Sequence, residues 1–197
     1  MKKVVLLGDS IREWYTNYVV ELLKDKCEVI SLLGDNGRFT YYSLFQLSMI
    51  LKEHGKVDLV HFNNGYWDMD VMPFLNRPVF SLEEYKHGLK RIIELSRAAG
   101  ADLIFATTTP LPSDVAAEDN TGTGVTFGFE QDRVKDFNNA AIELMKEENI
   151  EVNDLYAVCK QDKNFYKCED NLHHTEEGNR VLAQHVANAI LKELGME

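Results

Sequence analysis

A serine near the start of the chain and an acid–histidine pair near its end have the residue types of a nucleophilic triad. Ser10 follows a short apolar run at residues 4–7 and then a Gly-Asp pair. Asp170 precedes His173 by three residues, a spacing at which a turn can put a carboxylate beside an imidazole. Such a carboxylate fixes the histidine tautomer, so that the other ring nitrogen can take a proton from a serine hydroxyl. These residue types are therefore those of nucleophilic catalysis by a serine, with a histidine as base and a carboxylate that orients it.

Each of these residues also has a simpler interpretation. Serine is a favoured helix cap, and an aspartate three residues before a histidine is a common arrangement ahead of a helix. His174 is next to His173 and is an alternative base. A metal site built from Cys168, Asp170 and the two histidines is disfavoured, because ligands so close in sequence would be strained and no second ligand cluster occurs. We therefore expect no metal and no organic cofactor.

The elements that must position these residues are short apolar runs that alternate with amphipathic stretches. Strands are predicted at residues 4–7, 28–33, 58–62, 103–107 and 150–152. Helices are predicted at residues 14–23, 41–51, 82–98, 134–145 and 181–191. Strands separated by helices predict parallel βαβ units, hence an α/β three-layer sandwich with a five-stranded parallel sheet. One domain spanning residues 1–197 is expected from the length. In such sheets ligands bind beyond the carboxyl ends of the strands.

Three common motifs at strand ends are absent. The dinucleotide fingerprint GxGxxG does not follow the first strand, and no GxxxxGK[ST] phosphate-binding loop occurs. The GxSxG elbow of α/β-hydrolases fails because Arg12 stands where its second glycine should be. Nucleotide chemistry is thus disfavoured, while the polar strand ends remain candidates for acyl transfer.

Taken together, the Gly-Asp-Ser block, the Asp-x-x-His block and the order of the elements resemble the SGNH (GDSL-type) hydrolase family. The resemblance covers nearly the whole chain, and its last block continues with Thr175 and Gly178. It implies a flavodoxin-like SGNH hydrolase fold and a serine esterase without cofactor. It also implies that Ser10 is the nucleophile and an oxyanion donor through its N–H, and that Asp170 and His173 complete the triad.

The two middle blocks of the family pattern are less regular here. The second block implies a glycine N–H that donates to the oxyanion; Gly34 is our choice and Gly37 the alternative. The third block departs from G-x-N-D, because Trp67 stands in the asparagine position. Two asparagines precede it, and Asn64 is favoured slightly over Asn63 as an amide donor to the oxyanion. The alternative is that these asparagines only form a turn.

The function expected from the resemblance is hydrolysis of a small acyl ester, with carbohydrate O-acetyl groups as the favoured substrate. A short-chain lipid ester is the competing substrate, and an inactive binding module on the same fold is the competing class. Several aromatic side chains could line an acyl or sugar pocket, with the core or a covering loop as the favoured alternative: Tyr15, Tyr66, Trp67, Phe74 and Phe127. A long loop at residues 111–128 is expected over the site.

Charge and cysteine content limit the partners and the compartment. The net charge of −11 disfavours nucleic acid and anionic membranes as partners. The three cysteines form no CxxC pair and do not suggest a disulfide scaffold, which fits a reducing compartment. The first apolar run is too short for a signal peptide or a membrane span, so we expect a cytoplasmic protein.

Overall fold

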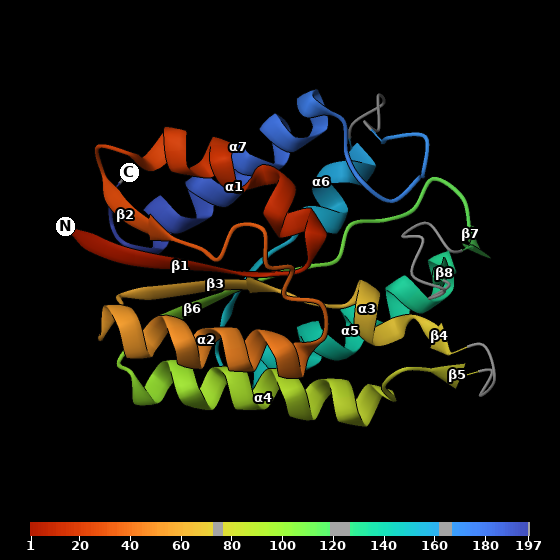
Figure 1. Ribbon diagram of the computed structural model, residues 1–197, viewed down its shortest axis with the longest axis horizontal. Helices are drawn as coiled ribbons and strands as arrows, with labels where there is room; N and C mark the ends of the chain where they lie inside the picture. The colour runs from red at the N-terminus through yellow and green to blue at the C-terminus, as the bar shows by residue number, and fades with distance from the viewer. Residues whose placement is uncertain (73–76, 119–126, 162–166, 197) are drawn as a thin grey trace.

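A five-stranded parallel sheet is the frame of the protein in the computed structural model, which describes residues 1–72, 77–118, 127–161 and 167–196 (Figure 1). The strand order is β2–β1–β3–β6–β9, and every neighbouring pair is parallel. The strands are β1 Lys2–Gly8, β2 Cys27–Ile30, β3 Leu59–Asn63, β6 Asp102–Ala106 and β9 Glu151–Asn153. The predicted five-stranded parallel sheet is confirmed.

Helices cover both faces of this sheet. On one face α1, Ser10–Leu23, packs against α7, Glu176–Glu193 (Figure 1). On the other face α2, Thr40–His54, contacts α4, Leu82–Ala98, which in turn contacts α5, Gln131–Glu147. The three-layer α/β/α arrangement predicted from the alternating pattern is therefore confirmed.

The central strands are buried on both faces. Residues 4–7 of β1 are no more than 1% exposed, and all five residues of β3 are buried. Parallel strands covered by helices on both sides read as continuous apolar runs for this reason. A polar side chain lies in the middle of β3: His61, whose Nε2 is 3.2 Å from Nδ2 of Asn153.

Several short elements beyond the carboxyl ends of the strands were not predicted. They are the helices α3, Tyr66–Met69, and α6, Leu155–Gln161, and two antiparallel pairs. The pairs are β4, Val71–Met72, with β5, Arg77–Pro78, and β7, Val115–Glu118, with β8, Phe127–Phe129 (Figure 1). The loop expected at residues 111–128 thus contains β7 and the start of β8, while its residues 119–126 lie outside the described part. Elements this short show no hydrophobic period.

Within the described ranges, no helix combines the length and the apolar content needed to span a membrane.

Candidate active site

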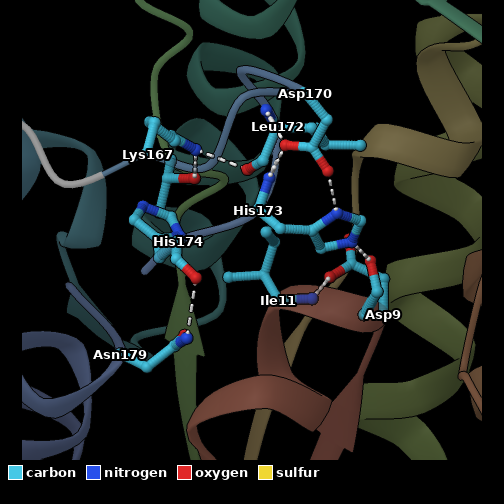
Figure 2. A network of polar contacts seen from close by, with 10 residues as sticks. Asp9, Ile11, Lys167, Asp170, Leu172, His173, His174 and Asn179 are labelled. Carbon is cyan, nitrogen blue, oxygen red and sulfur yellow. Dashed lines mark hydrogen bonds and ion pairs between the residues drawn. The ribbon is translucent and has the colours of Figure 1, made fainter. Parts of the chain in front are cut away.

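The structure brings the two ends of the chain together as a hydrogen-bonded series of three side chains. Oγ of Ser10 lies 2.8 Å from Nε2 of His173, and Nδ1 of His173 lies 2.7 Å from Oδ2 of Asp170. Figure 2 shows the Asp170 carboxylate turned toward the edge of the imidazole. This is the arrangement in which a serine hydroxyl can pass its proton to an imidazole that a carboxylate orients.

Asp170 is held in a tight local turn. Its Oδ1 accepts hydrogen bonds of 2.9 Å from the backbone N–H groups of Leu172 and His173 (Figure 2). Partial burial alone would raise the pKa of Asp170, but the bonds from the His173 ring and from these two N–H groups keep that pKa below its usual value. Asp170 is therefore an anion at neutral pH and can stabilise a positive charge on His173.

Ser10 is the first residue of α1, and the residue before it caps the helix. Asp9 is the N-cap, and its Oδ1 accepts a 3.0 Å hydrogen bond from the N–H of Ile11 (Figure 2). The hydroxyl of Ser10 is therefore not needed as a cap and is turned to His173 instead. Gly8, with φ of 150°, lets the chain turn sharply here, since a Cβ on it would lie 2.5 Å from the carbonyl oxygen of Asn63.

Arg12 binds this turn to the neighbouring loop. Its side chain is 1% exposed, and its guanidinium donates to the carbonyl oxygen of Gly8 at 3.0 Å and to Oγ of Ser31 at 2.9 Å. It also donates to the carbonyl oxygens of Leu32 and Asp35. The residue that breaks the GxSxG pattern thus anchors the end of β1 to the loop after β2. Sequence inspection missed this role, because the pattern around Arg12 gives no sign that its charge is buried.

Two buried carboxylates, Asp9 next to Ser10 and Asp68 in α3, are coupled electrostatically. Burial raises the pKa of Asp9 to about 6, although its hydrogen bond from Ile11 and the charge of Arg12 oppose the shift. Burial raises the pKa of Asp68 to about 7, although both the N–H and the hydroxyl of Thr40 donate to its Oδ1. The carboxylate of Asp9 contributes to the shift of Asp68, because two like charges disfavour each other.

The loop that carries His173 is secured by Lys167. The Nζ of Lys167 donates to the carbonyl oxygen of Leu172 at 2.6 Å and to Oγ1 of Thr109 at 3.3 Å (Figure 2). The N–H of Cys168 donates to the carbonyl oxygen of His173 at 2.7 Å. Burial lowers the pKa of Lys167 to about 8. Sequence inspection did not single out Lys167, whose only signal is its position three residues before Asp170.

The second histidine of the pair points elsewhere. His174 is 2% exposed, its Nε2 lies 3.6 Å from Sγ of Cys159, and its carbonyl oxygen accepts from Asn179 (Figure 2). Burial lowers the pKa of His174 to about 2. Of the two neighbouring histidines, His173 is the one beside Ser10. Across the described residues, no three His, Cys, Asp or Glu side chains are grouped so as to hold a metal ion.

Neither a protein-family model nor a curated protein matches the sequence. Solved structures do match it along its length. A GDSL-like lipase from Bacteroides thetaiotaomicron aligns with a TM-score of 0.71 at 19% identity, over 98% of this chain and 89% of that chain. A carbohydrate acetylesterase from Sinorhizobium meliloti aligns with a TM-score of 0.73 at 18% identity, over 98% of this chain and 100% of that chain. An aryl esterase from M. smegmatis aligns with a TM-score of 0.74 at 16% identity, over 98% of this chain and 99% of that chain. The chain has the fold of the GDSL-type SGNH hydrolases.

The two glycines predicted as oxyanion donors in this SGNH fold donate their N–H groups to other partners. The N–H of Gly34 donates to Oε1 of Glu13 at 2.6 Å, and the N–H of Gly37 donates to the carbonyl oxygen of Gly8 at 2.9 Å. The N–H of Gly34 is therefore taken by Glu13 in this structure. A role for Gly34 requires that this bond be exchanged, and it stays a prediction.

The two asparagines differ in how many hydrogens of the side-chain amide remain to be donated to an oxyanion. Nδ2 of Asn64 donates both of its hydrogens, to the carbonyl oxygen of Arg38 at 2.9 Å and to Oγ of Ser43 at 3.0 Å. Nδ2 of Asn63 donates to the carbonyl oxygen of Ala106 at 3.2 Å, which accounts for one hydrogen of the two. In this arrangement Asn63 is better suited to donate than Asn64, and the favoured role of Asn64 also stays a prediction.

The aromatic residues expected around an SGNH pocket separate into two groups. Tyr15 and Tyr66 are 0% and 2% exposed and belong to the core, which is the alternative favoured for them over a place in a pocket. Trp67 is half-buried, and the ring of Phe39 lies edge-on to it, with the two ring centroids 5.5 Å apart. Phe74 and the side chain of Phe127 lie outside the described part of the structure.

A cavity of about 330 Å³ lies beyond the end of β6. Its lining includes Leu111, Tyr156 and Cys159, but neither Ser10 nor His173. It is therefore separate from the hydroxyl that could react.

Proposed function

We propose that the protein is a serine ester hydrolase that acts on a small acyl ester. The observation that carries this proposal is the unbroken series of two short hydrogen bonds from the Ser10 hydroxyl through His173 to Asp170. The nucleophile, the base and the orienting acid thus stand within hydrogen-bond reach of one another, as the reaction requires. The fold shared with the SGNH hydrolases supports the same class of reaction by analogy.

The proposed reaction passes through an acyl-enzyme. Oγ of Ser10 bonds to the ester carbonyl carbon while its proton moves to Nε2 of His173. The tetrahedral intermediate then collapses, the ester C–O bond breaks, and His173 gives its proton to the leaving alkoxide. Water attacks the acyl-serine by the same route in reverse, which releases the carboxylic acid and restores Ser10. Asp170 accepts a hydrogen bond from Nδ1–H of His173 throughout and stays ionised.

The negative charge on the carbonyl oxygen needs donors near Ser10. The N–H of Ser10 is the first candidate, because the first N–H groups of a helix have no partner within the helix. The helix dipole of α1 adds partial positive charge at the same point. We propose a side-chain amide from Asn63 or Asn64 as the further donor, with Gly34 as a backbone alternative.

A carbohydrate O-acetyl group is the substrate we favour. The half-buried indole of Trp67 follows the end of β3 and has the type of surface on which a sugar ring stacks. A protein of the same fold from S. meliloti is a carbohydrate acetylesterase. A short-chain lipid ester is the competing substrate.

The test of the proposed function is labelling of the folded protein with a fluorophosphonate probe, followed by peptide mapping. We expect one adduct, on Ser10, and its loss in Ser10→Ala and in His173→Gln, since the hydroxyl needs the base. Ser113→Ala, which removes an exposed serine, is the matched control and should label fully. A folded protein that takes up no probe and does not hydrolyse p-nitrophenyl acetate would favour the binding-module interpretation instead.

The substrate is tested separately with acetylated sugars and p-nitrophenyl esters of increasing chain length. We expect kcat/KM to fall as the acyl chain lengthens from acetate. Faster hydrolysis of the longer esters would favour the lipid substrate while leaving the mechanism intact.

A further inference from the structure

Trp14 lies face to face with the imidazole of His173. Their ring centroids are 4.8 Å apart, and the planes are inclined by 15°. Trp14 follows Ser10 by four residues in α1, so the two side chains stand one turn apart on the same side of the helix. We propose that Trp14 is a positioning residue for His173. The indole keeps the imidazole in the plane that joins Ser10 and Asp170, and it stabilises the protonated imidazole during acyl transfer. This inference rests on the proposed function.

The hydrogen bonds of His173 leave one motion of the ring weakly restrained. Both bonds, from Ser10 and to Asp170, lie at the edge of the imidazole. Neither strongly opposes a tilt of the ring out of the plane that joins the two partners. A flat surface against one face opposes that tilt, and the distance and angle to Trp14 are those of a stacked aromatic pair.

The stacking also favours one protonation state over the other. When Oγ of Ser10 bonds to the carbonyl carbon, its proton passes to Nε2 of His173 and the ring becomes a cation. Indole is the aromatic face that attracts a cation most strongly. The contact is therefore stronger in the transition state than before the reaction, and an interaction of that kind raises kcat rather than substrate affinity.

The position of Trp14 is not explained by packing in the core. Its side chain is 48% exposed and is not part of the buried core. By contrast, Tyr15 next to it is completely buried. A large aromatic side chain that stays half in solvent with one face on the imidazole is consistent with a role at the site.

Other titratable groups surround His173 and must be kept constant in any test. They are Asp170 and Lys167 in the same loop, Asp9 at the start of α1, and the adjacent His174. All of them remain when only Trp14 is replaced. A changed response in a Trp14 variant therefore reports on the indole itself.

Fluorescence tests the contact independently of catalysis. The chain has two tryptophans, so Trp67→Phe leaves Trp14 as the only indole. A protonated imidazole in contact with indole quenches its fluorescence, so we expect a step of rising emission as the pH is raised. The step should vanish when His173→Gln is added to Trp67→Phe. A step that persists in that double variant, or no step at all, would overturn the contact.

Kinetics test the positioning role. We expect Trp14→Leu to lower kcat about 3- to 10-fold with KM nearly unchanged, the factor that a half-exposed cation–π contact and looser ring placement imply. Trp14→Phe keeps an aromatic face and should recover most of the loss. Phe45→Leu removes another half-exposed aromatic side chain, on α2, and should change neither constant.

The outcomes separate this inference from the proposed function. An unchanged kcat in Trp14→Leu, or a change in KM alone, would overturn the positioning role while leaving the esterase proposal standing. A wild-type protein with the fluorescence step but no ester hydrolysis would overturn both the proposed function and the catalytic part of this inference.

Discussion

The two halves of the candidate site are held in place by different parts of the molecule. In the half that carries Ser10, Asp9 and Arg12 are each 1% exposed and lie against the buried sheet. In the half that carries His173, the side chains of His173 and Asp170 are 21% and 40% exposed. The turn that carries Ser10 is thus anchored in the core, whereas His173 belongs to a surface loop.

The hydrogen bonds of the two halves differ in the same way in how far apart their partners lie along the sequence. Arg12 reaches partners about 20 residues away in the loop after β2, so the serine turn depends on the packing of two strands. Asp170 is held by neighbours two and three residues away, and Lys167 ties the loop to Thr109, beyond the end of β6. Changes in the serine half should therefore reduce stability, while changes in the histidine half should reduce activity alone.

The largest effect we expect is from Asp170→Asn. An amide NH₂ facing Nδ1 of His173 would favour the tautomer with its proton on Nε2, which cannot accept the proton of Ser10. We expect kcat on p-nitrophenyl acetate to fall by roughly 10⁴-fold. The unfolding midpoint in urea should stay close to that of the wild type, because the asparagine oxygen can still accept the two backbone N–H bonds.

Glu169→Gln is the matched control for Asp170→Asn, since it neutralises the exposed acid next to it. It should leave kcat unchanged. A clearly lower urea midpoint in Asp170→Asn would show that the histidine loop contributes to the stability of the core. The contrast between the two halves would then disappear.

The second prediction concerns the serine half. Arg12→Met removes a buried charged donor from several carbonyl oxygens, and each buried acceptor left without a partner costs roughly 1–3 kcal/mol. We expect the free energy of unfolding to fall by about 3 kcal/mol in total, because some acceptors regain partners by relaxation. Thermal unfolding should then shift down by roughly 6–12 °C for a chain of this size.

Arg180→Met is the control for Arg12→Met. Arg180 is an exposed arginine that lies over the ring of Tyr18 and pairs with Glu176, so its loss should hardly move the midpoint. A stable Arg12→Met protein with full activity would show that the serine turn does not need its anchor.

The same contrast explains how much could be predicted from the sequence. The sheet, its five main helices and the Ser10, Asp170 and His173 grouping follow from apolar periodicity and from short blocks that the family resemblance connects. The strand ends are different, because α3 and the two strand pairs are too short to show a period. The buried Arg12 and Lys167 were missed since nothing local to either residue signals a tertiary partner. The contact of Trp14 with His173 was not predicted, because apolar spacing within one helix does not identify a tertiary partner.

The third prediction distinguishes the two asparagines after β3. Asn64→Ala should mainly cost stability, about 1–3 kcal/mol, because the buried acceptors on Arg38 and Ser43 lose their donor. Asn63→Ala should mainly cost activity, roughly 10²-fold in kcat, since this amide has a hydrogen left for the oxyanion. Measuring kcat, KM and urea midpoints for both variants separates the two effects. The reverse pattern would restore Asn64 as the donor, and near-normal kcat in both would leave the backbone N–H groups as the donors.

The smallest expected effect concerns the cost of burying Asp68, whose pKa is coupled to the charge of Asp9 in the serine half. The pKa of Asp68 is about 7 in the folded protein, above the usual value near 3.8, so the folded state binds its proton more tightly than the unfolded state. The contribution of Asp68 to the free energy of unfolding is therefore fully present below about pH 4, and it is lost as the pH rises through about 7. Asp68→Asn does not titrate and can still accept both bonds from Thr40.

We therefore expect Asp68→Asn to be more stable than the wild type at pH 8 by about 1–3 kcal/mol, less than the full shift implies because the site can relax. The advantage should shrink to nothing at pH 4. His61, whose pKa is lowered to about 4 by burial, destabilises both proteins equally in acid and cancels from the difference. Asp132→Asn, in which the replaced aspartate is exposed and paired with Lys135, should show no gain at pH 8. If the gain from Asp68→Asn were the same at pH 8 and pH 4, it would come from packing, and the serine half would not carry the cost of a buried charge.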